Sequence, residues 1–459
     1  MATDVRVDFG ARTEKLLTDD GRAKPRCDTS SAPSFEGFFY AKSTCCNKQI
    51  DIGMKKKYTF IDLFAGCGGL SEGFYRKGFE ALAHVEINHW ACETIKKRMA
   101  HYGYKNIDEE VLECDITSKD ITEKIEKAVR GRTVDIIIGG PPCQAYSTAG
   151  RVRDAKGMAS DPRNYLFESY VSILEHFKPK FFVFENVTGL LSAKVNGDLI
   201  LPKIIEALGK HYNVLDDPKI LVHNTAEYGV PQLRKRIIII GVREDIEKVS
   251  ASDVYKAIKK THWSPDTPEI DRGKKIRFVD VRQAIGDLPF VEPGNDASAK
   301  EFKYPCNNEF LKRVGTSGVK PLHDHVARKN NELDRERFRI MIQNKWTFGQ
   351  LRRNMPEYEH ERARLFDNSY VVQWWDLPSK TILAHIHKDG FQYIHPDEKQ
   401  ARTFTVREAA RIQSFPDDFE FAGSRGEKYK QIGNAVPPLF AEAIAIAIKQ
   451  NLIELENDI

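Results

Sequence analysis

Cys143 is the residue of this sequence whose surroundings best suit a nucleophile. It follows the apolar run VDIIIGG at 134–140 and two prolines, so we expect it on a stiffened loop at the carboxyl end of a buried strand. Ligands bind at that end of the strands in open α/β sheets. A thiolate there can act as a nucleophile when its pKa is lowered or a proton acceptor lies near. The other seven cysteines form no CxxC pair, which argues against a zinc or thioredoxin-like site.

Polar side chains near two other predicted strands could take part in the same chemistry. Glu185 lies near the end of the apolar run FFVFENV at 181–187. Gln232, Arg234 and Arg236 alternate in PQLRKRI, which places all three on one face of a strand. Two interpretations stay open for that strand: a cationic strand aimed at a carboxylate or phosphate, or a solvated edge strand.

A glycine-rich turn, AGCGG at 65–69, follows the apolar run YTFIDLF and opens a helical stretch. Glycines in such a turn let the backbone approach a ligand closely. Glu86 ends the next predicted strand, where a carboxylate can accept hydrogen bonds from ribose hydroxyls, and Asp115 is a second acid at a strand end. Neither GxGxxG nor GxxxxGKS/T is present, so the pattern favours a nucleoside cofactor without a pyrophosphate.

The elements that must position these residues are short apolar strands separated by helical or loop segments. Strands that are apolar along their whole length indicate a sheet covered by helices on both faces. We therefore predict a doubly wound, Rossmann-like α/β fold, with strands in the runs 58–64, 81–87, 134–140, 181–187 and 236–242.

The alternation of strands and helices fades after about residue 243, and the stretch 291–400 is irregular. Helical periodicity returns at TVREAARIQSF and PPLFAEAIAIAIKQ, as expected if the chain folds back onto its first domain. The predicted division has four parts: an N-terminal extension (1–56), an α/β domain (57–290), a smaller irregular domain (291–400) and a C-terminal segment that returns to the α/β domain (401–459).

Composition narrows the class of protein. The sequence has no run of about 18 apolar residues and no apolar region at its N-terminus, so neither a membrane span nor a secretion signal is expected. A net charge of +4 permits a nucleic-acid partner without requiring one. We expect a cytoplasmic protein with no membrane contact.

Six motifs, in their order along the chain, resemble those of the DNA cytosine-5 methyltransferase family: FIDLFAGCGGLSEGF, GGPPCQAYS, ENV, QLRKR, TVREAARIQSFP and QIGNAVPP. The resemblance covers about 58–447 except for the irregular region, which matches the family's target-recognition domain in position. It implies a bacterial enzyme that flips a cytosine out of double-stranded DNA and methylates C5 with S-adenosylmethionine. It also implies a restriction-modification system, whose endonuclease would form no stable complex with this chain, and a monomeric enzyme.

The resemblance assigns catalytic roles residue by residue. Cys143 would add to C6 of the cytosine, and Glu185 would contact N3. Arg236 would contact the ring carbonyl or the thiolate side, while Arg234 would hold Glu185 in place.

Binding residues carry over in the same way. The implied S-adenosylmethionine contacts are Phe64, Gly66, Gly68, Glu86, Ile87, Asp115, Ile116, Leu166, Asn434 and Val436. The implied DNA contacts are Gln144, Ser147, Gln232, Thr381 and Ile382. No metal site is expected.

Two alternatives stay open from the sequence. One RNA-modifying branch shares these motifs, so a tRNA cytosine-5 methyltransferase is the first; the long region between QLRKR and TVREAARIQ favours DNA. The second is a non-catalytic DNA-binding relative, against which the intact PPCQ, ENV and QLRKR motifs argue.

Overall fold

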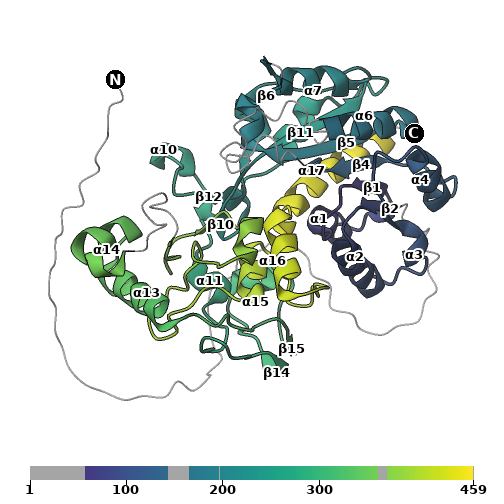
Figure 1. Cartoon of the computed structure of the whole chain (residues 1–459). Helices are drawn as coiled ribbons and strands as arrows, with labels where there is room; N and C mark the ends of the chain where they lie inside the picture. Colours follow the sequence, from purple (N-terminus) through teal and green to yellow (C-terminus); the bar gives the residue numbers. More distant parts are fainter. Residues whose placement is uncertain (1–56, 143–164, 196, 360–369, 458–459) are drawn as a thin grey trace, which may run out of the picture. The chain divides into compact units, whose positions relative to one another are not determined.

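The computed structural model describes residues 57–142, 165–195, 197–359 and 370–457. Cys143, Gln144 and Ser147, which carry three of the predicted roles, lie outside these ranges. Within the described ranges the central sheet has eight strands, in the order β3-β2-β1-β4-β5-β11-β8, with β9 also paired to β11. This mixed α/β architecture with a parallel-rich sheet (Figure 1) confirms the predicted fold class.

The parallel part of the sheet runs from β3 to β5. β1 pairs with β2 on one side and with β4 on the other, so the direction of winding reverses at β1. Such a switch point opens a crevice outside the carboxyl ends of the strands. The strand bounds are β1 (Thr59–Leu63), β2 (Glu80–Glu86), β3 (Val111–Glu113), β4 (Ile136–Gly139), β5 (Phe181–Val187), β8 (Tyr212–Asn213), β9 (Val222–Asn224) and β11 (Lys235–Arg243).

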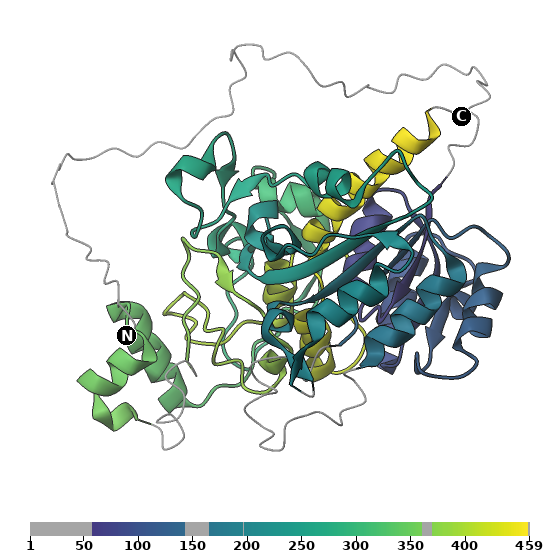
Figure 2. The ribbon, with the colours of Figure 1, turned by 90° about the horizontal axis from the view of Figure 1, so that it is seen from above.

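Helices cover both faces of the sheet because successive apolar residues of each strand point to opposite faces. On one face, Phe60 and Ile138 pack with α1 (Gly69–Arg76), α2 (His89–His101) and α17 (Pro438–Glu456). On the other face, Ile61 and Ile137 pack with α4 (Ile121–Val129), α6 (Leu166–Phe177) and α7 (Ile200–Leu208). Figure 2 shows the yellow α17 and the blue helices on opposite sides of the sheet.

β11 runs antiparallel to β5, unlike the strands before it. The reversal brings the amino-terminal end of β11, with the QLRKR motif, to the edge of the sheet where β1, β4 and β5 end. Strand direction cannot be inferred from apolar periodicity, yet here it determines which motifs meet.

The region after the sheet is built from short elements with a small apolar core of its own. Two of its helices are α13 (Glu332–Asn344) and α14 (Phe348–Asn354), which Figure 1 shows in green, away from the sheet. Phe338, Phe348 and Tyr370 are among the buried residues of this core. The domain boundaries at 290 and 400 stay predictions, because the chain from Lys56 onward forms one compact unit.

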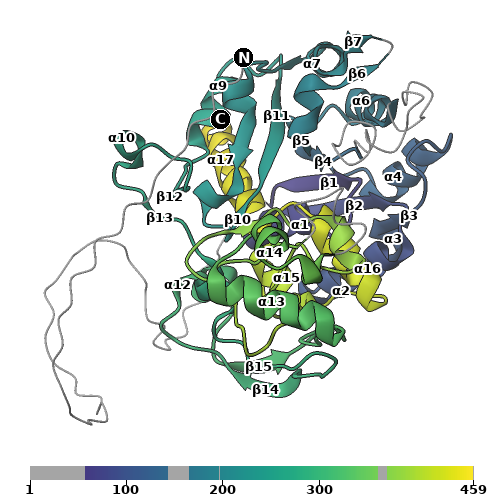
Figure 3. The same cartoon turned by 60° about the vertical axis from the view of Figure 1, so that its left-hand side comes forward.

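This region is joined to the sheet by a pair of two-residue strands, β10 (Gln232–Leu233) and β16 (Ser379–Lys380). Two helices of the C-terminal segment, α15 (Val406–Ile412) and α16 (Arg425–Asn434), lie side by side in Figures 1 and 3 and contact each other.

One stretch, Arg425–Glu456, is long and apolar enough to cross a membrane by length and composition alone. In the structure it comprises α16 and α17, and 78% of its most apolar window is buried inside the protein. Its apolar surface is therefore used by the core of the α/β unit.

Candidate active site

Glu185 and Arg236 form an ion pair at the edge where β5 ends and β11 begins, with 2.9 Å between Glu185 Oε1 and Arg236 Nε. The antiparallel register places Arg236 opposite Val187 and Glu185 opposite Ile238. Residues two positions apart share a face of a strand, so the two side chains are diagonal neighbours. Both are largely buried, with exposed side-chain fractions of 13% and 10%. The pair holds a carboxylate in a fixed position beside a guanidinium.

The segment that leads to Cys143 is fixed against this ion pair. Asn186 donates a hydrogen bond from Nδ2 to the Pro141 carbonyl over 3.2 Å. A Cβ atom built on Gly140 would lie 2.8 Å from Glu185 Oε2, so glycine allows the chain to pass closely over the carboxylate. Two residues further on, the described chain ends, and the position of Cys143 itself stays a prediction.

Burial confirms the alternation along PQLRKRI. Gln232, Arg234 and Arg236 are buried, whereas Lys235 is exposed and Leu233 is half-buried. The interpretation as a solvated edge strand is therefore wrong, because the three side chains face the interior. Arg236 meets a carboxylate, as the interpretation of a cationic strand requires.

The predicted role of Arg234 needs correction, because its side chain does not contact Glu185. Its Nη1 donates to the Ile382 carbonyl over 2.7 Å, and its Nη2 donates to the Gly433 carbonyl over 3.1 Å. The cause is the register: Arg236 already lies opposite the last residue of β5, so Arg234 extends beyond that strand. Arg236 is the arginine that holds Glu185.

The predicted DNA contacts in the described ranges lie against the same strand. Gln232 and Ile382 are fully buried, and the Ile382 amide donates to Gln232 Oε1 over 2.8 Å. Thr381 is half-buried and donates from Oγ1 to the Leu233 carbonyl over 2.6 Å. These are interior, supporting positions; contact of the three side chains with DNA stays a prediction.

The glycine-rich turn forms at the end of β1 through three residues with positive φ: Phe64 (58°), Gly66 (55°) and Gly68 (81°). Glu86, at the end of β2, accepts hydrogen bonds from the amides of Gly66 at 2.8 Å and Ile87 at 3.0 Å. It also accepts from the Asn88 amide at 2.8 Å. The turn and the end of β2 are thus held together by one carboxylate.

The remaining predicted cofactor residues come from several elements. Asp115 is exposed, and its Oδ1 accepts two hydrogen bonds from Thr117. Those bonds hold the pKa of Asp115 below its usual range, so the group is a carboxylate near neutral pH. The other positions range from buried to exposed: Ile116 and Val436 buried, Leu166 half-buried, Ile87 and Asn434 exposed.

This donor set fits a nucleoside cofactor. Carboxylates at the ends of adjacent strands can accept from hydroxyl and amino groups, and a carboxylate offers about four acceptor positions. Three backbone amides of the protein occupy three of the acceptor positions of Glu86. The Ile87 side chain is 67% exposed and offers an apolar surface beside the carboxylates. A Cβ atom built on Gly66 would meet no atom within 4 Å, so the turn is open on that side.

Two other cysteines near the turn are poor nucleophiles. Cys67 and Cys92 are buried, and burial raises the pKa of each thiol to about 12. Neither group supplies a thiolate near neutral pH.

Several residues important to the site were missed by sequence reasoning. Asn186 belongs to the ENV motif, and that adjacency could have identified it. Gln413 lies in the TVREAARIQSFP motif, from which only helical periodicity was inferred. The same motif carries three charged residues that are fully buried: Arg407, Glu408 and Arg411.

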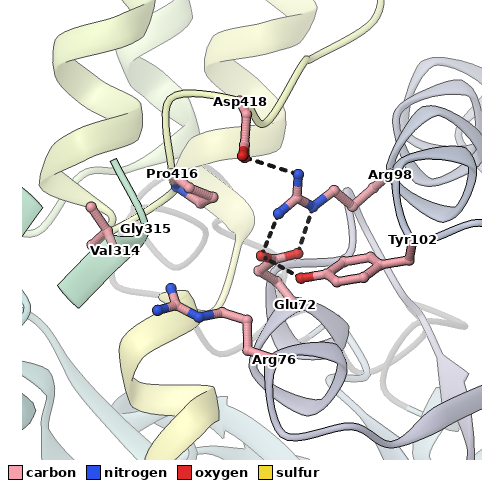
Figure 4. Close-up of a pocket in the computed structure, with 8 residues that line it drawn as sticks. All are labelled: Glu72, Arg76, Arg98, Tyr102, Val314, Gly315, Pro416 and Asp418. Atoms are coloured by element: carbon pink, nitrogen blue, oxygen red, sulfur yellow. Dashed lines mark hydrogen bonds and ion pairs between the residues drawn. The ribbon is translucent and has the colours of Figure 1, made fainter. Parts of the chain in front are cut away.

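A pocket elsewhere in the molecule contains none of the predicted site residues. Figure 4 shows that Arg98 bridges Glu72 and Asp418, while Tyr102 also donates to Glu72. The bonds from Arg98 to Glu72 measure 2.7 and 2.8 Å. These charges satisfy one another, so the network ties α1 and α2 to the loop before α16.

Comparison with known proteins identifies related sequences across most of the chain. A family model described as C-5 cytosine-specific DNA methylase matches residues 58–450. Type II methyltransferase M.Bpa9945I from Bacillus paralicheniformis is 35% identical, covering 85% of this chain and 98% of that protein. Type II methyltransferase M.DdeI from Desulfomicrobium norvegicum is 33% identical, covering 87% of this chain and 90% of that protein.

Solved structures share the fold. A DNA modification methyltransferase encoded within an E. coli prophage has a TM-score of 0.62 at 24% identity, covering 86% of this chain and 100% of that chain. Entamoeba histolytica methyltransferase EhMeth has a TM-score of 0.50 at 17% identity, covering 88% and 100%. At these identities the likeness concerns the architecture, a mixed α/β fold around a parallel-rich sheet.

Proposed function

This chain belongs to the C-5 cytosine-specific DNA methylase family, and on that premise we propose how its own residues carry out the reaction. The enzyme is a DNA cytosine-5 methyltransferase. Its role is that of the methyltransferase in a restriction-modification system. Cys143 is the proposed nucleophile, and Glu185 and Arg236 are the groups that assist it.

The chemistry requires a nucleophile because C5 of cytosine does not accept a methyl group unaided. The Cys143 thiolate forms a bond to C6, and Glu185 stabilises the protonated N3 that accompanies the addition. When bound, S-adenosylmethionine would supply the methyl group to C5 and leave as S-adenosylhomocysteine. Loss of the C5 proton to water, release of the N3 proton and breakage of the bond between C6 and Cys143 then restore the aromatic ring and the free thiolate. Covalent catalysis of this kind divides one difficult step into easier steps.

The observation that carries this proposal is the meeting of three motifs at one sheet edge. Asn186 fixes Pro141, two residues before the nucleophile, while Arg236 fixes Glu185 over 2.9 Å. The segment that leads to the proposed nucleophile is therefore held beside Glu185 at the ends of β4 and β5, and Arg236 of β11 orients the Glu185 carboxylate. Preorganisation of such groups is a main source of catalytic rate.

The proposed cofactor site is the glycine-rich turn with the ends of β2 and β3. Glu86 would hold the ribose hydroxyls and Asp115 the adenine amino group, with Ile87 and Ile116 beside the ring. Phe64, Gly66, Gly68, Leu166, Asn434 and Val436 would complete the enclosure.

The substrate is DNA. We propose that the target cytosine is flipped out of the duplex, at a cost of a few kcal/mol, because C6 is not accessible to a thiolate within the base stack. The proposed contacts around it are Gln144, Ser147, Gln232, Thr381 and Ile382. We further propose a cytoplasmic enzyme that acts as a monomer, without contact to a membrane and without a stable complex with its endonuclease.

The test is a methyl-transfer assay with labelled S-adenosylmethionine and plasmid DNA. Wild type should label DNA, and Cys143→Ala should remove at least about 99.9% of that activity while binding the cofactor normally. DNA containing 5-fluorocytosine should trap wild type covalently but not the variant. Cys306→Ala is the matched control, because its exposed thiol has no proposed role and its loss should leave transfer measurable. A Cys143→Ala enzyme that still methylates DNA would refute the mechanism, and transfer to tRNA alone would refute the DNA substrate.

A further inference from the structure

Three buried side chains, Gln232, Arg234 and Gln413, connect the proposed DNA-contact segment to the segment that closes the proposed cofactor site. We call them the buried clamp. Their exposed fractions are 0%, 1% and 0%. They come from the QLRKR motif and from the end of α15, which are far apart in the sequence.

On the DNA side, the clamp holds both backbone groups of Ile382. The Ile382 amide donates to Gln232 Oε1 over 2.8 Å, and its carbonyl accepts from Arg234 Nη1 over 2.7 Å. Thr381, next to it, donates to the Leu233 carbonyl on the same strand. The position of the 381–382 segment is therefore set by the strand that also carries Arg236.

On the cofactor side, the clamp holds the end of α16 and the residues after it. Gln413 Nε2 donates to the Ile432 carbonyl over 2.6 Å and to the Ala435 carbonyl over 3.3 Å. Arg234 Nη2 donates to the Gly433 carbonyl over 3.1 Å. These carbonyls flank Asn434 and Val436, the two residues proposed to complete the cofactor site.

The two sides are joined in two ways: Arg234 donates to the Ile382 and Gly433 carbonyls at once, and Gln232 Nε2 donates to Gln413 Oε1 over 2.9 Å. The segments also touch directly, because a Cβ atom built on Gly433 would lie 2.2 Å from the Ala384 amide nitrogen. Beyond Gly433, the Val436 carbonyl would lie 2.5 Å from a Cβ atom built on Gly69, the first residue of α1 after the glycine-rich turn. Contacts thus run without a break from Ile382 to the turn.

The clamp places polar side chains, one of them charged, in the interior, where a purely apolar core would have none. A buried guanidinium is costly unless its N–H groups are paired. Burial lowers the pKa of Arg234, the nearby charge of Arg236 adds to that effect, and Glu185 opposes it. Among the described residues Arg234 has no carboxylate partner, and its Nε has no acceptor. Arg234 therefore lies where the Ile382 and Gly433 carbonyls, one from each segment, come together.

We propose that Gln413, acting with Gln232 and Arg234, is a positioning residue that couples the DNA-contact segment to the cofactor site. The inference rests on the proposed function of the two segments. Occupation of the cofactor site fixes residues 432–436, and through the clamp it fixes Ile382, so cofactor and DNA strengthen each other's binding. Such coupling is reciprocal by thermodynamic necessity.

The coupling can be measured without catalysis. A labelled duplex carrying the methylated site, identified by bisulfite sequencing of methylated plasmid, is titrated with enzyme in the presence and absence of saturating S-adenosylhomocysteine. In wild type the ratio of the two dissociation constants should be at least about fivefold. In Gln413→Met, which keeps the shape but loses the amide, the ratio should fall to within about twofold of unity. Arg234→Lys keeps the charge but loses the planar guanidinium whose two Nη atoms each reach one carbonyl, and its ratio should be intermediate.

Gln431→Leu is the matched control. Gln431 lies on α16, the helix whose end the clamp holds, and is 6% exposed; its side chain accepts a hydrogen bond from Thr94 and donates one to the Ala422 carbonyl, neither of which is a clamp residue. Its loss should lower the melting temperature but leave the ratio at the wild-type value.

The proposal is overturned if wild type shows no coupling, if Gln413→Met keeps the wild-type ratio, or if Gln431→Leu lowers the ratio equally. If Gln413→Met does not fold, Arg234→Lys takes its place in the test, and a wild-type ratio in that variant would overturn the proposal. Methyl transfer by wild type distinguishes failure of this proposal from failure of the proposed function. If only the coupling proposal is wrong, wild type still methylates DNA. If the proposed function is wrong, wild type does not methylate DNA.

Discussion

Arg236 lies one diagonal step from Glu185 across the pairing of β11 with β5, and the two side chains meet at 2.9 Å. This contact exists only because β11 runs against β5. In a parallel arrangement the amino-terminal end of β11 would lie at the opposite edge of the sheet. The direction of β11 therefore decides whether the Glu185 carboxylate has an ion-pair partner.

Glu185→Gln should slow methyl transfer by about 100-fold or more, because the amide keeps the shape but cannot stabilise a protonated ring nitrogen. Affinity for S-adenosylhomocysteine should change by less than about twofold, since Glu185 lies on β5, whereas the proposed cofactor carboxylates lie at the end of β2 and just after β3. Single-turnover kinetics and calorimetric titration would measure the two effects. Equal loss of rate and of cofactor affinity would contradict the assignment.

Asp62→Asn should flatten the pH dependence of stability. Asp62 is 1% exposed; burial raises its pKa to about 7, the Ser71 hydrogen bond opposes the rise, and Glu86 adds to it. A raised carboxyl pKa means that its contribution to stability is complete below about pH 4 and is lost as the pH rises towards 7. Between those values wild type should lose on the order of a few kcal/mol more unfolding free energy than the variant. Urea unfolding at several pH values tests this, and parallel curves would contradict it.

Glu408→Ala should destabilise the protein by about 3–5 kcal/mol, because it leaves a buried guanidinium without its counter-ion. Glu408 accepts from Arg402 at 2.7 and 2.8 Å and is fully buried. Burial works to raise the pKa of Glu408, but Arg402 outweighs it and holds the pKa below its usual range. Glu309→Ala, which removes an exposed pair with Lys312, should cost less than about 1 kcal/mol. Denaturant titration of both variants would show the contrast, and similar losses would argue against it.

Gly433→Ala should disturb the join between α16 and the 383–384 backbone, because the added methyl carbon would lie 2.2 Å from the Ala384 nitrogen. We expect a loss of about 1–3 kcal/mol in stability and weaker DNA binding. Gly426→Ala on the same helix meets only Ser424 Oγ, at 3.8 Å, and should be neutral or stabilising. Thermal unfolding and DNA titration of the two variants test the pair of expectations; a destabilising Gly426→Ala with a silent Gly433→Ala would reverse them.

Much of the sheet and the glycine-rich turn was predictable from the sequence. β4 is apolar throughout, and the turn follows β1, which is apolar except for Thr59 and Asp62. Glu86 and Asp115 were correctly placed near strand ends because parallel strands end at one edge.

The partners of the interior polar residues were not predictable. Alternation placed Arg234 and Arg236 on one face, but only the register shows that Arg236 reaches Glu185 and Arg234 does not. Gln413 looked like one more helical residue, because its partners come from segments 19 to 181 residues away. Pairing over such separations is a tertiary property that local patterns do not contain.

The contact of α17 with α1 has a consequence for the folding of the chain during its synthesis. A Cβ atom built on Gly73 would lie 2.4 Å from the Ala441 carbonyl carbon, and Tyr58 donates a 2.8 Å hydrogen bond to Glu456. The first strand and helix of the sheet therefore gain their flanking layer from the last helix. Contacts of such long sequence separation form late and slowly. A ribosome-bound chain exposes the apolar flank of α1 until α17 emerges, so this flank is where we expect chaperones to bind the growing chain.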